Sequence, residues 1–382
     1  MNDLENYKAI LDQYFGIESA RFDTSTGETN NLIGALNRTG YESFRSVFLN
    51  RCKRLAARYM PSYPNRKHLL DRLNEICNKD TWNGAYAEMV VYDFLNSDGN
   101  WLPEPINLSK TVPATETLAG SHGKKHANFD GYYDEFNVCF DVKVLGDKSR
   151  QILDEIISKA KAKIGNPSVS IIPEYPLDND FALFRKNDRS LIEELAGAIN
   201  VVAKTTLVKS LVLPQLSYKL IWQSGSLTTV STYDPYQHAE NHHHLLFKHA
   251  KKFSVTQPSL IVFVFFPWFS EKVIGQFDSN QIFYRSLCRR FFCQYAKDLS
   301  PAKNSPLCKG FQGSETLAEV PEKLSGILFL EDTSITTSDT ESQNVEAFAY
   351  LNPNAAHKVS DRFRDHLSSL GFLIDDLAHD NY

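Results

Sequence analysis

The 382-residue sequence has no apolar run long enough to cross a membrane. Its longest one, LIVFVFFPWF, is well short of the roughly 20 residues that a transmembrane helix needs. The first residues, MNDLENYKAI, are polar and partly acidic, so we expect no secretory signal peptide there. The six cysteines lack the spacing of a paired motif, which favours reduced thiols. Together these absences predict a cytoplasmic protein without a membrane partner.

The composition also excludes disorder over long stretches. Hydrophobic residues make up 42% of the chain and charged residues 23%, as in folded proteins. The length allows two domains, or one core that carries large insertions. Apolar residues recur at helical spacing in residues 42–60 and 66–78, so we expect residues 1–80 to be mainly helical.

The net charge of −5 is spread unevenly along the chain. Residues 313–382 contain 4 basic and 13 acidic side chains, so the rest is basic on balance. Within residues 44–72, eight basic side chains accompany a single acid, Asp71. This stretch is either a solvated helix surface or a basic face for nucleic acid. The acidic C-terminal part is a candidate surface for a homodimer or a protein partner.

One predicted helix is apolar on nearly all sides, which indicates burial. It spans about 84–95, within the sequence GAYAEMVVYDFL, and Glu88 lies in its middle. A buried carboxylate requires a cation, a metal or hydrogen-bond donors nearby. The alternative is a glutamate that reaches solvent along one stripe of the helix.

Within the segment NFDGYYDEFNVCFDVKVLGD, residues 128–147, apolar and polar side chains alternate with period two over 137–144, as in a strand. Its polar face carries Asp141 and Lys143, and it is either solvated surface or the floor of a site. With a tight turn at Asp134-Glu135, Asp130 becomes the diagonal neighbour of Asp141, roughly 7 to 8 Å away between Cα atoms. Two such carboxylates can share one divalent cation, and oxygen ligands suit Mg²⁺ or Mn²⁺ rather than zinc.

This ordered set of residues resembles the PD-(D/E)xK nucleases of the restriction-endonuclease-like fold. In that superfamily a helix carries a glutamate, a strand carries an aspartate, and the next strand carries (D/E)-x-K. Here the helix supplies Glu88, NFDGYY supplies Asp130, and FDVKVL supplies Asp141 and Lys143. Phe129 stands where the family name expects a proline, which is often absent.

The resemblance implies an α/β (α+β) fold, in which a restriction-endonuclease-like core has a mixed central sheet flanked by helices. Asp130 and Asp141 would ligate the metal, helped by the Val142 carbonyl. Lys143 would orient the attacking water, and Glu88 would hold a further water molecule or a second metal. The implied activity is that of a Mg²⁺-dependent endonuclease that hydrolyses phosphodiester bonds, with DNA favoured over RNA and restriction or anti-phage defence as the setting.

The family fold continues with a helix and a buried strand. Residues 235–252, followed by PSLIVFVFF, fit this pair, with Lys248, Lys251 and Lys252 as basic residues near the site. Helix 148–163, followed by SVSIIP, is the alternative pair. The preferred choice predicts a helical N-terminal region at 1–80, a nuclease core at 81–275 with an insertion at about 150–234, and a C-terminal helical and acidic region at 276–382.

Further basic side chains are candidates for contacts with phosphates, which position a nucleic acid without reading its sequence. They are His122, Lys124 and Lys125, together with Arg51, Arg54 and Arg58 of the predicted helix 42–60.

Two other functions remain open. His238 and His242 are four residues apart on one helix face, as zinc ligands can be, so the cluster His238–His244 is compatible with a zinc hydrolase. The motif H-E-x-x-H, however, requires the glutamate beside the first histidine, and Glu240 is displaced. The third possibility is a catalytically inactive subunit that binds nucleic acid or supports assembly.

Overall fold

The computed structural model of the protein contains two compact units. The first comprises Met1–Leu145 and Pro235–Tyr382, and the second comprises Gly146–Asp234. The second unit therefore interrupts the first in sequence. The structure describes residues 3–16, 31–78, 81–96, 105–114, 126–145, 148–165, 168–175, 181–201, 206–222, 235–253, 255–266, 278–308, 314–335, 337–371 and 373–377.

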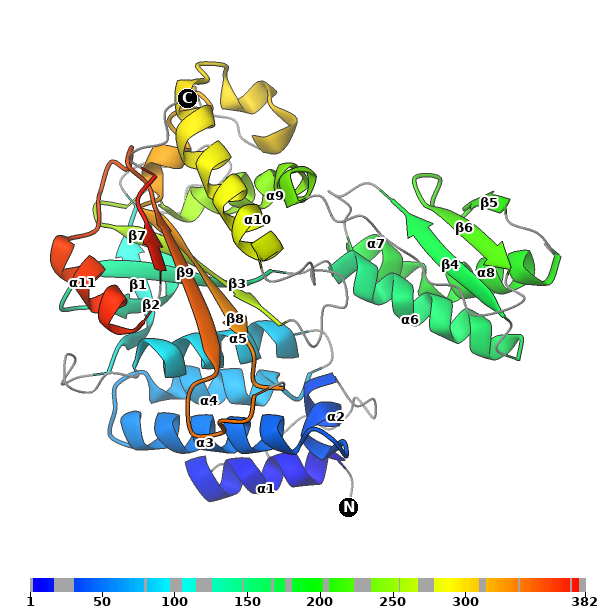
Figure 1. Ribbon diagram of the computed structural model, residues 1–382, viewed down its shortest axis with the longest axis horizontal. Coiled ribbons are helices and arrows are strands. Elements are labelled where there is room, and N and C mark those ends of the chain that lie inside the picture. Colours follow the sequence, from blue (N-terminus) through cyan, green and yellow to red (C-terminus); the bar gives the residue numbers. More distant parts are fainter. Residues whose placement is uncertain are drawn as a thin grey trace. The chain divides into compact units, whose positions relative to one another are not determined.

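Seven of the described strands form one mixed sheet in the first unit, in the order β1-β2-β3-β7-β8-β9-β10 (Figure 1). Strands β1, β2 and β3 pair in antiparallel fashion, whereas β3, β7 and β8 run parallel. Strand β9 is antiparallel to β8 and parallel to β10. The strands are β1 (Asn107–Pro113), β2 (His126–Tyr133), β3 (Val138–Val144), β7 (Ser259–Phe265), β8 (Gly326–Asp332), β9 (Val345–Leu351) and β10 (Leu373–Asp375).

Helices cover both faces of this sheet, so the fold is mixed α/β (Figure 1). None of the described helices has the length and apolar character needed to span a bilayer. The helices of the first unit are α1 (Asp3–Phe15), α2 (Asn31–Asn37), α3 (Glu42–Arg58), α4 (Arg66–Glu75), α5 (Trp82–Leu95), α9 (Pro235–His249), α10 (Asp278–Arg289) and α11 (Asp361–Ser369). Shorter turns of helix are η2 (Ala250–Phe253), η3 (Arg290–Gln294), η4 (Tyr295–Lys297), η5 (Ala302–Asn304), η6 (Pro306–Cys308) and η7 (Pro321–Lys323).

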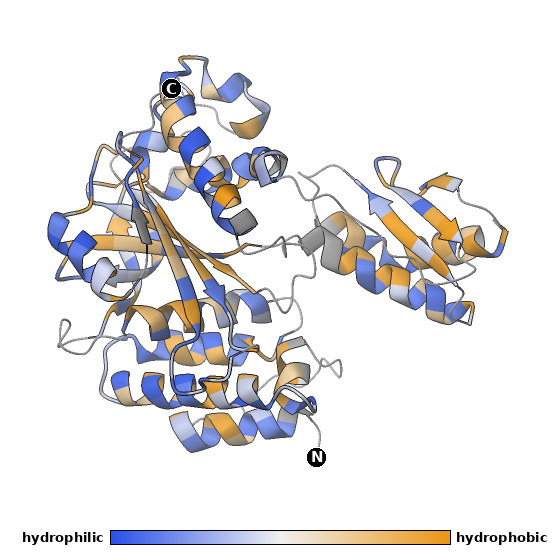
Figure 2. Cartoon of the chain, in the orientation of Figure 1, coloured by the Kyte–Doolittle hydropathy of each residue, from blue (hydrophilic) through white to orange (hydrophobic). Residues whose placement is uncertain are grey.

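The predicted alternation of β3 is confirmed, because its two faces enter different hydrophobic cores. Val138 and Phe140 pack with side chains of the N-terminal helices, whereas Cys139 packs with α9 and α10. Hydrophobic residues line the central strands in Figure 2. Strand β7 is buried at every position, as a continuous apolar run predicts for a central strand.

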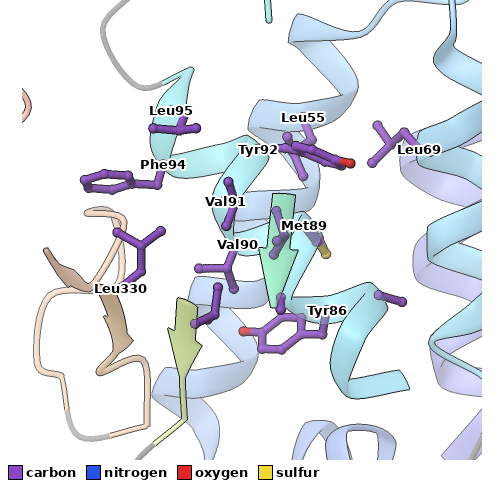
Figure 3. Close-up of a cluster of buried hydrophobic side chains, with 14 of the residues drawn as sticks. Leu55, Leu69, Tyr86, Met89, Val90, Val91, Tyr92, Phe94, Leu95 and Leu330 are labelled. Carbon is purple, nitrogen blue, oxygen red and sulfur yellow. The ribbon is translucent and has the colours of Figure 1, made fainter. Parts of the chain in front are cut away.

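Helix α5 is buried on nearly all sides, as its sequence predicts. Every residue of α5 except Gly84 is buried. Figure 3 shows its apolar side chains close to Leu55 of α3, Leu69 of α4 and Leu330 of β8. The same helix carries Glu88, whose side chain is buried as well.

The predicted two-residue turn between β2 and β3 is wrong. Four residues, 134–137, form the turn, and Tyr133 pairs with Val138. Asn137 adopts a left-handed conformation with φ of 55°, which asparagine tolerates better than most residues. The longer turn moves Asp130 two positions along β3, so that it lies near Asp141 directly rather than diagonally.

The C-terminal part was expected to be a separate helical and acidic region, and this expectation is also wrong. Strands β8, β9 and β10 belong to the central sheet, and residues 235–382 share one compact unit with the N-terminal part. The sequence GILFLED of β8 is buried at every position beside β7. Apolar burial in the sheet, rather than net charge, decides where this segment lies.

The second unit has its own sheet and core. Its described strands pair antiparallel in the order β4-β6-β5, and one side packs against helices through residues such as Ile156, Leu195 and Tyr218. Helix α6 and strand β4 belong to this unit, whereas β3 pairs with β2 and β7 in the first. The elements are α6 (Lys148–Lys163), β4 (Val169–Glu174), α7 (Phe181–Lys186), α8 (Asp188–Val201), β5 (Thr206–Lys209) and β6 (Ser217–Trp222).

Candidate active site

The four residues predicted to be catalytic lie together in the first unit. Lys143 Nζ lies 2.7 Å from Asp141 Oδ2 and 3.9 Å from Asp130 Oδ2. The Tyr92 hydroxyl donates to Glu88 Oε2 at 2.8 Å and lies 2.9 Å from the Asp130 carbonyl oxygen. Strands β2 and β3 therefore bring two carboxylates and one ammonium together, and Tyr92 of α5 links Glu88 to the backbone of Asp130.

Strand pairing stops beside Asp130, and this places its carboxylate. The β2–β3 ladder ends at Gly131 and Phe140. Beyond that pair, the Val142 N–H donates to Asp130 Oδ2 at 2.7 Å, so a side chain takes the role of a strand carbonyl. In the neighbouring strand β1, Ser109 has φ of 59°, a local irregularity beside the same point.

The alternation of side chains along β2 is interrupted at Asp130, so residues on either side of it point to opposite faces of the sheet. Phe129 packs against Phe253, on the side of α9. Gly131 instead lies under the Phe140 ring, on the side of α5, and a Cβ atom there would be 1.9 Å from that ring. Residues 129 and 131 would share one face in a regular strand. The close approach that only glycine permits thus accompanies the bend that turns Asp130 toward the site.

The Lys143 ammonium is surrounded by three oxygen atoms from the predicted ligand residues. Besides the two aspartates, it donates to the Val142 carbonyl at 2.8 Å. Among the described residues, Asp141 Oδ2 has no hydrogen bond with suitable angles, so the ammonium holds it by charge. A cation at this point meets two carboxylates and a carbonyl, which is the oxygen donor set that Mg²⁺ or Mn²⁺ prefers.

A second lysine completes the surroundings of Asp141. Lys252 Nζ donates to Asp141 Oδ1 at 2.7 Å, and the Asp141 side chain is wholly buried. Lys252 belongs to η2, which Phe253 anchors against β2. Of the lysines expected near the site, Lys248 is exposed and Lys252 makes the contact. The side chain of Lys251 lies outside the described residues.

Glu88 is buried and has polar and basic partners, as its sequence environment predicts, but the sequence did not indicate which residues supply them. Its Oε2 lies 3.1 Å from His68 Nε2, and its Oε1 lies 3.5 Å from Arg72 NH1. His68 and Arg72 are four residues apart on α4, so both face α5. The only signal in the sequence was the basic character of residues 66–72. The described residues contain no group of three His, Cys, Asp or Glu side chains that could hold a metal ion.

The two aspartates have opposite electrostatic surroundings. Burial, together with the charges of Asp141 and Glu88, raises the pKa of Asp130 to about 7. Burial alone would raise the pKa of Asp141 as well, but Lys143 and Lys252 hold it below its usual value. Asp141 is therefore charged at neutral pH, while Asp130 takes up a proton more readily than an ordinary aspartate. A divalent cation would relieve this repulsion between carboxylates.

The prediction that Arg51 contacts phosphates is wrong. Its side chain is fully buried and bonds to Asp93 at 3.2 Å, to the Tyr86 hydroxyl at 2.6 Å and to the Gln343 carbonyl at 3.0 Å. Arg54 also bonds to Asp93, through two contacts of 2.7 and 2.8 Å. These arginines tie α3 to α5 and to the C-terminal part of the chain.

The remaining predicted residues are candidates for phosphate contacts or for zinc ligation. His122, Lys124 and Lys125 lie outside the described residues, and Arg58 is partly buried on α3. The rings of His238 and His242 are 4.2 Å apart between centroids, and His238 packs on Phe283. His242 Nδ1 is 2.8 Å from the His238 carbonyl oxygen, so these contacts are those of a packed helix surface.

The chain was also compared with known proteins. No family model, no curated protein and no solved structure matches it.

Proposed function

We propose that the protein is a metal-dependent nuclease that hydrolyses phosphodiester bonds, with DNA as its substrate. One observation carries the proposal: the Lys143 ammonium lies among oxygens of Asp130, Asp141 and Val142. The order of elements supports it as well. A helix with Glu88, a strand with Asp130 and a strand with Asp141 and Lys143 are followed by α9 and by β7, parallel to β3. This is the order that the resemblance to PD-(D/E)xK nucleases implies.

The proposed roles follow from the contacts. Asp130, Asp141 and the Val142 carbonyl would hold Mg²⁺ or Mn²⁺. Such an ion lowers the pKa of a water molecule and neutralises phosphate oxygens. Lys143 supplies positive charge where charge develops on the phosphate. Glu88, fixed by Tyr92, adds a third carboxylate within electrostatic range of Asp130.

Basic side chains around the carboxylates support a polyanionic substrate. Lys143, Lys252, His68 and Arg72 are all partly exposed while they contact these carboxylates. Lys143, Lys252 and Arg72 offer positive charge to a phosphate that approaches from solvent, which a site for a neutral substrate does not require. Arg51 and Arg54 take no part, because they are committed to Asp93.

A substrate panel tests the proposal. Supercoiled plasmid, linear duplex, single-stranded DNA and RNA are incubated with Mg²⁺, with Mn²⁺ and with a chelator. We expect cleavage of DNA with either metal and none with the chelator. Binding of nucleic acid without cleavage of any of the four substrates would favour the inactive binding subunit instead.

A further inference from the structure

The Lys143 ammonium lies where a divalent cation would need to bind. It is 2.7 Å from Asp141 Oδ2, 2.8 Å from the Val142 carbonyl and 3.9 Å from Asp130 Oδ2. An ammonium and a metal ion compete for the same oxygens, because both are cations that need negative or partially negative partners. The free protein thus contains its own substitute for the metal.

Lys252 is arranged differently, although it contacts the same carboxylate. It donates to Oδ1, with a hydrogen bond of 2.7 Å, and leaves Oδ2 to the other side. Its position is set by η2 and by the packing of Phe253 on Phe129. Lys252 can therefore keep its hydrogen bond to Oδ1 when a metal ion binds at Oδ2. Lys143 contacts Oδ2 itself, so it must leave before the metal ion binds there.

We propose that Lys143 is an internal latch that lowers metal affinity until nucleic acid binds. This inference rests on the proposed function. In the free protein the ammonium occupies the oxygen cage formed by Asp130, Asp141 and Val142. A phosphate attracts the ammonium out of the cage, toward solvent, to which the Lys143 side chain is partly exposed. The vacated oxygens then accept the metal, so nucleic acid and metal bind cooperatively.

The physical basis is the charge balance of Asp141. This carboxylate is wholly buried and carries two ammonium partners, which together overcompensate its charge. Adding a divalent ion without removing an ammonium would place three cations around one carboxylate. Release of Lys143 to a phosphate restores the balance. Lys252 stays and keeps Asp141 ionised and oriented.

Metal affinity without nucleic acid is the direct test. Mn²⁺ binding is measured by calorimetry on the wild type, Lys143→Met, Lys252→Met and Asp141→Asn, each checked for folding by thermal melting. The latch predicts that Lys143→Met binds Mn²⁺ about ten- to a hundredfold more tightly than the wild type, as loss of a charge-assisted competitor requires. Lys252→Met removes the same charge from the same carboxylate, but its affinity for Mn²⁺ should rise far less.

Two outcomes separate the latch from the proposed function. Equal gains in Lys143→Met and Lys252→Met, or no gain in either, would overturn the latch while the metal site stands. Unchanged Mn²⁺ binding by Asp141→Asn would overturn the metal site itself. If Lys143→Met melts early, Lys143→Gln serves in its place.

A second readout is the effect of nucleic acid on metal affinity. Ca²⁺ is used as a probe ion in the presence and absence of a short DNA duplex. The duplex should tighten Ca²⁺ binding in the wild type and in Lys303→Ala, whose lysine is exposed in η5. It should have little effect in Lys143→Met. Equal tightening in Lys143→Met and the wild type would contradict the latch.

Discussion

The Lys252 ammonium donates to Asp141 Oδ1 at 2.7 Å, although 111 residues separate the two in the chain. The intervening sequence includes the whole second unit. The parallel pairing of β3 with β7, and the short helix η2 before β7, bring Lys252 back to the site. The charge of a wholly buried aspartate is thus supported by a residue from a distant segment of sequence.

Lys252→Ala should slow cleavage by about ten- to a hundredfold, which corresponds to a lost hydrogen bond to a charged group. Lys252→Arg should restore part of the rate, because a guanidinium can still donate to Oδ1. Cleavage rates at saturating Mg²⁺ provide the measurement, and Lys303→Ala, at an exposed lysine of η5, is the control. A wild-type rate in Lys252→Ala would mean that the contact has no role in positioning Asp141.

Gly131→Ala should destabilise the protein by about 3 kcal/mol, because the added Cβ meets the buried Phe140 ring. Gly84→Ala is the matched control. It lies in α5 with no atom within 4 Å of the added Cβ, and it should stabilise the protein by up to about 1 kcal/mol. Urea unfolding of both variants decides the matter, and similar midpoints would contradict the packing described around Asp130.

Arg51→Met should cost about 3 kcal/mol of unfolding free energy, since removal of one partner leaves buried carboxylates uncompensated. Asp93 and Asp332 are both buried beside Arg51, the latter at 3.7 Å. The exposed Lys53 on the same helix is the control, and Lys53→Ala should change stability by less than about 0.5 kcal/mol. Equal stability of the two variants would show that Arg51 is not part of the core.

Acid should destabilise the protein through the histidines of α9. Burial, with the charge of Arg290 nearby, lowers the pKa of His243 to about 4, whereas an unfolded histidine titrates near 6.5. The unfolded state therefore binds the extra proton first, and stability falls as pH drops below about 6.5. The loss from His243 is on the order of 2 kcal/mol at pH 5. His243→Gln should melt closer to the wild type at pH 5 than at pH 7.5, and an unchanged gap would contradict this.

Local patterns predicted the central elements well. Helix α5, strand β3 and strand β7 follow from the local pattern of apolar residues, because each is buried over most of its length. Strand alternation around Asp141, the apolar helix around Glu88 and the resemblance to PD-(D/E)xK nucleases were enough to nominate Glu88, Asp130, Asp141 and Lys143, because all three are local features of the sequence.

Features that depend on tertiary contacts were missed. The register of β2 and β3 depends on a left-handed Asn137, which no hydrophobic pattern reveals. The charge of Arg51 predicted an exposed side chain. Its burial is possible because two buried aspartates, Asp93 and Asp332, offset the cost of removing the guanidinium from water. Strands β8 and β9 were not predicted, because the net negative charge of residues 313–382 suggested an exposed region. The sequence GILFLED of β8 is nevertheless wholly buried.

The most direct measurement is the rate of DNA cleavage in Mg²⁺ by the wild type, Asp141→Asn and Lys143→Ala. All are compared at matched folding, judged by circular dichroism and thermal melting, with Asp71→Asn on the exposed side of α4 as the control. Both site variants should lose at least about a hundredfold in rate, as loss of several kcal/mol of transition-state stabilisation requires, while the control cuts normally. If both site variants cut as fast as the wild type, these residues are not a catalytic centre.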